Sequence, residues 1–256
     1  MIRPLYPVAG DALVDLAAFL FQDERIPPGR PWMMVNMVNS IDGATAVDGG
    51  ATGLTGADDQ ALFHAFRAVG DVVLVGASTV RAEGYGPVVL NGANRMARSR
   101  AGRPDSPRLA VISRSLDLDP EARLFSESER PPLLLTCAAA PSERVEALSA
   151  RAEILVAGTD DVDLPRAVAM LGDRGHDLVL CEGGPTLNGH LMAADLVDEI
   201  NLSTAPLVVA GQSPRIVRSQ LPAPDPLGYQ LDRLLMGDAM VFARWLRNRD
   251  PVTAGR

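Results

Sequence analysis

The chain of 256 residues contains no lysine, because all 24 of its lysine-plus-arginine positions are arginines. This absence excludes a Schiff-base lysine, a lysine general base and the Gly-Lys-Ser/Thr loop that holds phosphates in many nucleotide-binding proteins. Cysteine and histidine are also scarce, with two and three residues respectively. Two cysteines are too few for a disulfide framework or a four-cysteine zinc site, and the histidines are not paired at ligand spacing. The sequence therefore predicts no metal site.

Long apolar runs are missing as well. No uninterrupted run reaches the ~18–20 residues that a membrane span requires, and no basic head followed by an apolar core marks a signal peptide. The formal net charge of −8 argues against a nucleic-acid surface, which needs clustered positive charge. Apolar residues make up 47% of the chain and charged residues 22%, a composition that supports a sizeable core. We expect a folded, cytoplasmic protein without nucleic-acid or membrane partners.

Short apolar runs alternate with helix-like segments over most of the chain. The runs are rich in Val, Ile and Leu and lack period-two alternation, which is typical of strands covered on both faces. Strands are expected at residues 32–38, 72–76, 109–113, 133–137, 154–157 and 178–181. Helices are expected at residues 58–69, 142–150 with Ser142 as the cap, 164–173 and 185–193, the last beginning at a proline. This repetition predicts right-handed crossovers and a mainly parallel sheet.

The C-terminal third changes character. Residues 199–204, 229–236 and 239–246 are expected to be strands, and the Gly237-Asp238 turn predicts an antiparallel hairpin. The predicted fold class is therefore α/β, with a mixed, mostly parallel sheet. We divide the chain into an N-terminal appendage (1–30, with an amphipathic segment at 13–21), a single domain (31–248) and a tail (249–256). The stretches 94–104 and 222–226 are expected to be loops.

Two strand ends carry residues suited to binding. Ligands of parallel sheets bind beyond the carboxyl ends of the strands, where helix N-termini present free N–H groups. Gly76 ends one strand and is followed by the hydroxyl residues Ser78 and Thr79. Glu182 directly follows another strand, where a carboxylate faces the cleft or pairs with an arginine. It precedes two glycines and a proline-started helix, an arrangement that directs backbone N–H groups at an anion such as pyrophosphate. Tight strand-to-helix geometry is the alternative reason for glycine at either turn.

Three further groups of residues have two interpretations each, and one histidine has a single interpretation. Asp42 precedes a glycine and indicates a turn first and a ligand contact second. Ser113 and Arg114 follow a strand, where a hydroxyl and a guanidinium suit the 2′-phosphate of NADP, or where a solvated loop ends. His64 is interpreted as structural. A solvated loop or a phosphate site explains the one basic cluster, which consists of Arg95, Arg98, Arg100 and Arg103.

Taken in order, these segments resemble the reductase domain of the riboflavin-biosynthesis deaminase-reductase. The family pattern has Ser-Leu-Asp-Gly after the first strand, Arg-Ala-x-x-Asp at a helix end, Gly-x-x-Thr-Val, and later Glu-Gly-Gly. The corresponding segments here are Ser40-Ile41-Asp42-Gly43, Arg67-Ala68-Val69-Gly70-Asp71, Gly76-Ala77-Ser78-Thr79-Val80, Glu182-Gly183-Gly184, and Leu196-Val197-Asp198-Glu199 leading to Ala205-Pro206. The match extends over residues 32–245. The His-x-Glu and Pro-Cys-x-x-Cys motifs of the deaminase half do not occur.

The resemblance implies a three-layer αβα fold of the dihydrofolate reductase type, with NADPH lying across the carboxyl ends of the strands. The implied cofactor contacts are Asn39, Asp42, Gly76, Ser78 and Thr79, then Ser113 and Arg114 at the 2′-phosphate, and Gly183, Gly184, Pro185, Thr186 and Leu187 at the pyrophosphate. Arg67 and Glu182 are implied to face the substrate. A homodimer is also implied, with the apolar run 202–209 as a candidate interface.

The implied substrate is 5-amino-6-(5-phosphoribosylamino)uracil or its precursor before deamination, whose ribosylamino group is reduced at C1′ to a ribityl chain. Two departures from the family pattern concern this substrate. Glu83 stands in a Gly-rich loop where the family has Asp-Asp-Pro or Asp-Asn-Pro, and Leu90 stands where the family has an arginine for the substrate phosphate. The basic cluster is a candidate replacement for that arginine, or the substrate lacks the phosphate.

Glu83 and Glu182 are the candidate catalytic residues. We expect Glu182 to orient the substrate and Glu83 to deliver the proton, which requires desolvation of its carboxyl group; a solvated ion pair with Arg81 is the alternative for Glu83. Two other functions stay open. One is a dihydrofolate reductase-like enzyme acting on another pterin or pyrimidine, and the other is a non-catalytic nucleotide-binding protein that kept the fold.

Overall fold

The central strands are apolar and buried on both faces. In the computed structural model, which describes residues 2–6, 15–219 and 226–249, β3 (Val72–Gly76) illustrates the arrangement. Val73 and Val75 pack into the core on one face of the sheet, while Val72 and Leu74 pack into the core on the other. Both sets of side chains are therefore apolar, which explains why the run does not alternate.

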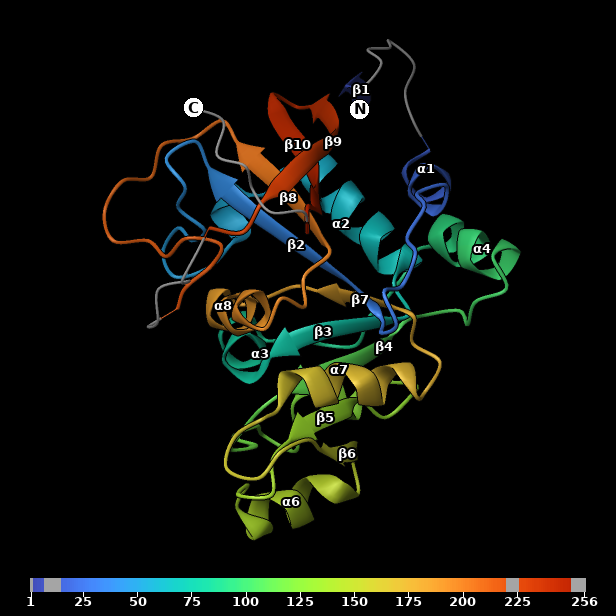
Figure 1. Ribbon diagram of the computed structural model, residues 1–256, viewed down its shortest axis with the longest axis vertical. Coiled ribbons are helices and arrows are strands. Elements are labelled where there is room, and N and C mark those ends of the chain that lie inside the picture. Colours follow the sequence, from blue (N-terminus) through green and yellow to red (C-terminus); the bar gives the residue numbers. More distant parts are fainter. Residues whose placement is uncertain (1, 7–14, 220–225, 250–256) are drawn as a thin grey trace.

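Within the described residues, ten strands form one sheet in the order β1-β9-β10-β8-β2-β7-β3-β4-β5-β6 (Figure 1). The remaining strands are β1 (Arg3–Tyr6), β2 (Trp32–Ser40), β4 (Arg108–Ile112), β5 (Leu133–Thr136), β6 (Glu153–Val156), β7 (Leu178–Cys181), β8 (Glu199–Ala205), β9 (Tyr229–Gly237) and β10 (Met240–Arg247). The strands from β8 to β6 are parallel, whereas β10 pairs antiparallel with β8 and β9, and β9 with β1. The predicted mixed, mostly parallel sheet with an antiparallel hairpin is confirmed.

Helices cover both faces of this sheet and complete three layers (Figure 1). They are α1 (Leu16–Phe21), α2 (Ala57–Val69), α3 (Ala77–Glu83), α4 (Gly92–Arg100), α5 (Arg123–Ser126), α6 (Ser142–Ser149), α7 (Leu164–Gly172) and α8 (Pro185–Ala193), with a 3-10 turn, η1, at Thr52–Leu54. Helices α1 and α2 share one core with β3 and β4, and α7 and α8 share the other. No helix among these residues is long and apolar enough to cross a membrane.

Most expected elements occur with small differences at their ends. The strands at 72–76 and 178–181 and the helix at 185–193 have the expected bounds, and other ends differ by one or two residues, as helix and strand ends commonly do. One cap was predicted wrongly, because Pro141 is the N-cap of α6 and Ser142 is already helical. Helix α1 covers the end of the expected segment 13–21, whose first residues lie outside the described part. Most of the expected loop 222–226 also lies outside it.

The arginine-rich segment 94–104 is not the loop that was predicted, since most of it belongs to α4. Its Arg98 side chain is fully buried and donates hydrogen bonds to the carbonyl oxygens of Ala68, Gly70 and Pro104. Burial, reinforced by the positive charge of Arg103, lowers the pKa of Arg98 to about 10. Arg98 thus satisfies carbonyl groups at the end of α2, which otherwise lack partners.

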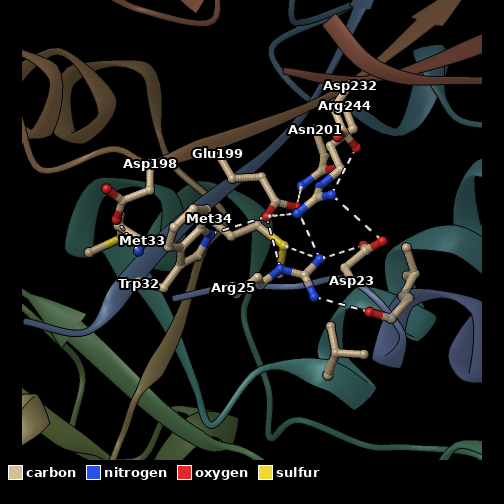
Figure 2. Close-up of polar contacts among 12 residues, drawn as sticks. Asp23, Arg25, Trp32, Met33, Met34, Asp198, Glu199, Asn201, Asp232 and Arg244 are labelled. Carbon is tan, nitrogen blue, oxygen red and sulfur yellow. Dashed lines mark hydrogen bonds and ion pairs between the residues drawn. The ribbon is translucent and has the colours of Figure 1, made fainter. Parts of the chain in front are cut away.

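A buried ionic cluster joins the N-terminal segment to the antiparallel part of the sheet (Figure 2). The carboxylate of Glu199 on β8 accepts hydrogen bonds from Arg25, Trp32, Asn201 and Arg244. Burial of Glu199 opposes its ionisation, but the charges of Arg25 and Arg244 outweigh that effect and hold its pKa below the usual range. The side chains come from the segment before β2 and from β2, β8 and β10, so the cluster fixes these elements together.

Candidate functional site

A cavity of about 640 Å³ lies beside α2 at the carboxyl end of β2. It is enclosed by α2, the end of β2, the loop before α2, the segment from α3 to residue 87, and the turn before α8. The predicted site residues among its walls are Arg67, Ser78, Thr79, Glu83, Glu182, Gly184 and Pro185. Sequence positions up to 118 residues apart therefore meet at one cavity, as expected for the carboxyl ends of parallel strands.

Arg67 and Glu182 form a close ion pair in the wall of the cavity. Arg67 lies in the last turn of α2 and Glu182 directly follows β7. Arg67 Nε lies 2.7 Å from Glu182 Oε1, and Arg67 Nη2 lies 2.7 Å from Glu182 Oε2. The side chains are 13% and 3% exposed. The Arg67 guanidinium also lies 4.1 Å from the centre of the Phe63 ring. This pairing neutralises both charges and leaves their outer edges on the cavity.

Tyr85, which was not among the predicted site residues, completes this group. Its hydroxyl donates a 2.7 Å hydrogen bond to Glu182 Oε2. Burial and the adjacent Glu182 charge raise the pKa of Tyr85 well above its usual value, so the phenol stays protonated and acts as a donor. The signal in the sequence was the Gly84-Tyr85-Gly86-Pro87 loop, which was noted only as a departure from the family pattern.

Two helices begin side by side next to this group. The Gly76 N–H donates a 2.8 Å hydrogen bond to the Gly183 carbonyl, which joins the turn before α3 to the turn before α8. Neither helix has a side-chain hydrogen bond at its N-cap. A Cβ atom on Gly184 would come within 2.6 Å of the Thr79 hydroxyl oxygen. The glycine therefore keeps the two turns close and leaves first-turn N–H groups available, which suits an anion such as pyrophosphate.

The other members of the proposed pyrophosphate contact lie on α8. Leu187 is buried, and its Cβ atom lies close to Gly76 across the junction, whereas Thr186 is exposed. Gly183 has a φ of 84°, a conformation that favours glycine. Of these residues, Gly184 and Pro185 line the cavity itself.

Ser113 and Arg114 follow β4, the neighbour of β3, and therefore lie at the same edge of the sheet as Gly76. The Ser113 hydroxyl is buried and accepts a hydrogen bond from the Leu116 N–H. Arg114 is exposed. Of the two expected 2′-phosphate contacts, only Arg114 has a side chain that is open to a ligand.

Asn39 and Asp42 are engaged with the β8 strand and the loop that follows it. Asn39 accepts a 3.0 Å hydrogen bond from the Thr204 hydroxyl, and Asp42 accepts hydrogen bonds from Ser40 and from the N–H groups of residues 209 and 210. The hydrogen bond from Ser40, followed by those two backbone contacts, lowers the pKa of Asp42 to about 2. Neither residue lines the cavity, and the positions support the turn interpretation of Asp42.

Glu83 lines the cavity at its exposed side, at the end of α3. Its carboxylate lies next to Gly50, and its side chain is exposed to solvent. The burial that was expected to desolvate this carboxyl group is therefore not present. The alternative for Glu83, an ion pair with Arg81, is not seen either, since Arg81 contacts Asp117.

The basic cluster does not reach the cavity. Arg98 and Arg103 bind backbone carbonyls at the end of α2, and Arg95 binds the carbonyl of Leu90. Among the described residues, Arg67 is the one arginine in the cavity wall. The phosphate-site interpretation of this cluster is therefore not supported. Across the described chain, no three His, Cys, Asp or Glu side chains gather as metal ligands would.

Comparison with known proteins places these features in a family. The model of the RibD C-terminal domain matches residues 31–246. The 2,5-diamino-6-ribosylamino-4(3H)-pyrimidinone 5′-phosphate reductase of Methanothermobacter thermautotrophicus is 32% identical over 186 residues, which cover 73% of this chain and 82% of that protein. Another relative of the same name, from Archaeoglobus fulgidus, is 28% identical over 184 residues, covering 72% of this chain and 84% of that protein.

Solved structures of similar proteins show the same fold. A pyrimidine reductase-like protein from Corynebacterium diphtheriae superimposes with a TM-score of 0.82 at 26% identity, covering 93% of this chain and all of that one. RibD from Acinetobacter baumannii, at 19% identity and a TM-score of 0.70, covers 87% of this chain and 59% of its own, and shows the shared fold. The predicted three-layer α/β fold with its mixed, mostly parallel sheet is thus shared with solved reductase structures, and the chain belongs to the RibD C-terminal domain family.

Proposed function

We propose that this chain is an NADPH-dependent reductase of riboflavin biosynthesis. Its substrate is a 5-amino-6-(5-phosphoribosylamino)pyrimidine, whose ribosylamino group becomes a ribityl chain. The names of the relatives support the reaction class. The observation that carries the proposal is the cavity, because it joins an anion-accepting pair of helix starts to the polar Arg67–Glu182–Tyr85 group.

NADPH fits the first part of this site. When bound, NADPH supplies a hydride, and the residues that would hold its pyrophosphate are Gly183, Gly184 and the first turn of α8. Thr79 lies against Gly184 and fixes the width of that seat. Arg114 is the candidate contact for the 2′-phosphate, since a guanidinium matches phosphate geometry.

The second part of the site would position the substrate. Arg67 offers N–H donors and Glu182 offers acceptors, and their mutual pairing together with Tyr85 holds both groups in fixed orientations. This arrangement suits a sugar chain that both donates and accepts hydrogen bonds. Glu83 lines the exposed side of the cavity without the expected burial, so its proposed role is to relay a proton between solvent and the substrate rather than to act as a desolvated acid.

The test is NADPH oxidation, followed by absorbance, with the phosphoribosylaminopyrimidine and separately with dihydrofolate. Reduction of the ribosylamino substrate is the expected result. Reduction of dihydrofolate alone would favour the alternative of a dihydrofolate reductase-like enzyme. NADPH binding without NADPH oxidation in the presence of either substrate would favour a non-catalytic nucleotide-binding protein. Comparison of NADPH with NADH in the wild type and in Arg114→Ala tests the cofactor, because loss of the 2′-phosphate contact should weaken only NADPH.

We further propose a homodimer formed through the antiparallel part of the sheet. One face of this antiparallel part carries apolar side chains that are only partly buried and that lie opposite one another on neighbouring strands. They are Leu202 on β8, Leu234 and Met236 on β9, and Val241, Ala243 and Trp245 on β10. A second copy would cover this face. Sedimentation of the wild type and of Val241→Arg should show a dimer and a monomer, whereas a monomeric wild type would contradict the proposal. A cytoplasmic location stays a prediction.

A further inference from the structure

The wall of the cavity is more acidic than basic. Among the described residues, one guanidinium lines it, that of Arg67, together with three carboxyl groups, those of Asp59, Glu83 and Glu182. Arg67 donates from Nε and Nη2 to the two oxygens of Glu182 at 2.7 Å each, so its charge is matched within the protein. Neither of the other two carboxyl groups has an arginine partner within the described chain. The wall therefore offers no unmatched positive charge to an anion.

Two more basic side chains lie near this wall and do not alter the balance. His64 lines the cavity, and burial, followed by the positive charge of Arg67, lowers its pKa, so the ring is neutral at pH 7. Arg123 lies outside the wall, next to Gly86, whose added Cβ atom would come within 3.3 Å of Arg123 Nη2. Both oxygens of Glu127 accept hydrogen bonds of 3.0 Å from this guanidinium. Its charge is therefore matched as well.

A smaller hollow of about 170 Å³ adjoins the cavity, and Pro87 lines both. Leu90 lines this hollow at the position that was compared above with a phosphate-binding arginine. It is 2% exposed and packs with Ala17 and Ala68, so an apolar contact fills that position. The hollow contains three arginines and three acidic residues, namely Arg95, Arg108, Arg130, Asp105, Glu127 and Glu129. It is balanced in charge rather than basic.

Backbone N–H groups at helix starts are the other means of holding a phosphate. The starts of α3 and α8 present such groups, and the proposed function assigns them to the pyrophosphate of the cofactor. The start of α2 has acidic residues in its first turn, Asp58 and Asp59, and both are buried. Carboxyl groups thus already occupy the end of α2 that would attract an anion.

These features concern the 5′-phosphate of the proposed substrate, so the inference rests on the proposed function. A phosphate monoester carries a charge of about −1.5 to −2 at pH 7. The remainder of a ribosylaminopyrimidine is uncharged, and its hydroxyl and amino groups form hydrogen bonds with carboxylates and with a guanidinium. An acidic wall therefore suits the uncharged part of the molecule and repels the phosphate.

We propose that the cavity takes the ribosylaminopyrimidine without its 5′-phosphate, as an uncharged compound, and that the phosphate adds nothing to recognition. The reduction is the one proposed above, because the phosphate takes no part in hydride transfer to C1′. Hydrolysis of the ester is then the class of reaction that supplies this substrate. In that step water cleaves the phosphate from the 5′-oxygen, which leaves a hydroxyl group and inorganic phosphate.

The first test compares kcat/KM for a 5-amino-6-ribosylaminopyrimidine and for its 5′-phosphate ester, at saturating NADPH. A site that binds the phosphate through a charged hydrogen bond loses roughly tenfold or more when the phosphate is removed. Here kcat/KM for the dephosphorylated compound is expected to stay within about tenfold of that for the ester, or to exceed it. A larger fall overturns the inference.

Ionic strength gives an independent readout. Salt screens the repulsion between the phosphate and the wall, with a Debye length of about 10 Å at 0.1 M. The ratio of kcat/KM for the ester to that for the dephosphorylated compound should therefore rise as salt is added. A ratio that falls with salt indicates attraction of the phosphate, and a ratio that does not change indicates no repulsion. Either result overturns the inference.

A charge added to the wall should create the missing recognition. Gln60 is exposed on α2, lines the cavity and has no role in the proposed function. Gln60→Arg should raise the ratio of kcat/KM for the ester to that for the dephosphorylated compound by roughly tenfold. Gln60→Met is the matched control, because it keeps the length without the charge, and it should leave the ratio unchanged. An equal response of both variants overturns the inference.

A variant in the smaller hollow tests the rival location for a phosphate. Arg130→Gln removes an exposed arginine that lines the hollow and lies outside the cavity wall. It should leave the ratio of the two kcat/KM values unchanged. A selective loss of activity with the ester would mean that the phosphate is held in the hollow, which overturns the inference. Circular dichroism spectra and NADPH affinities of all three variants show whether fold and cofactor site are retained.

The outcomes also separate this inference from the proposed function. If the wild type reduces the ester alone, the function stands and the inference is overturned. If it reduces neither compound, the proposed function falls, and calorimetric affinities for the two unreduced compounds decide about the phosphate. Affinity for the ester that is equal or weaker supports the inference. Binding of the ester that is tighter by about tenfold or more overturns it.

Discussion

Glu182 carries a charge that is matched inside the protein, and its replacement by glutamine is expected to destabilise the fold. The carboxylate is 3% exposed and accepts two hydrogen bonds of 2.7 Å from Arg67 and one of 2.7 Å from Tyr85. Burial acts against the charged form of Arg67, but Glu182 outweighs that effect and raises the pKa of Arg67. After Glu182→Gln, the buried guanidinium remains charged and loses its anion.

The expected loss follows from the geometry. Breaking a buried ion pair by removing one partner costs ~3–5 kcal/mol. Arg67 is 13% exposed and keeps its contact with the Phe63 ring, so the lower end, about 3 kcal/mol, applies. For a domain of this size, 1 kcal/mol corresponds to roughly 2–4 °C in Tm, which gives a decrease of roughly 6–12 °C. Tyr85→Phe removes one hydrogen bond to a charged group and should cost about 1.5 kcal/mol.

Urea unfolding at pH 7 measures these losses through the midpoint, provided that the m value is unchanged. The informative comparison is the double variant Arg67→Met/Glu182→Gln, which leaves no unpaired buried charge. It should recover at least half of the stability that Glu182→Gln loses. If the double variant is as unstable as the sum of the single changes, the two charges do not interact as the geometry indicates, and the reasoning fails.

Three further predictions concern other parts of the chain. Arg98→Met should lower the free energy of unfolding by ~2–4 kcal/mol in urea titrations, because carbonyls at the end of α2 lose their donors. Gly184→Val should weaken NADPH binding more than tenfold in fluorescence titrations while the circular dichroism spectrum is retained, since its Cβ would meet Thr79. The pKa of Glu199 is lowered in the folded state, so its stabilising effect is complete above the ordinary glutamate range and disappears as pH falls below it. The stability difference between wild type and Glu199→Gln should therefore narrow below about pH 4.

The sequence predicted the parallel strands well because a strand that is buried on both faces is a continuous apolar run, and such a run is visible in the sequence. In β3 and β7 every side chain must be apolar, whichever face it points to. The segment of helix α4 has no comparable apolar pattern. Its segment is rich in arginine, and its position depends on Arg98, whose buried guanidinium binds the end of α2. A contact with residues 28 and 30 positions away is not visible in the local pattern.

The candidate site was predicted only in part, because some of its contacts join residues that lie far apart in the sequence. Glu182 and the following glycines were identified because a strand end with this composition is unusual locally. The pairing of Glu182 with Arg67 spans 115 positions, so it emerges only when α2 packs against the sheet. Tyr85 was missed because a single aromatic residue in a glycine-rich loop resembles an ordinary turn. The exposure of Glu83 could not be anticipated either, because it depends on the loops that surround the cavity.

The two buried carboxylates of the cavity differ in whether a cation of the protein balances their charge. Glu182 has a charge balanced by Arg67, so it stabilises the contact between α2 and β7 and is useful to the fold even without a ligand. Asp59 has burial without a matching cation, and burial raises its pKa. A residue that acts against stability is expected where function requires it.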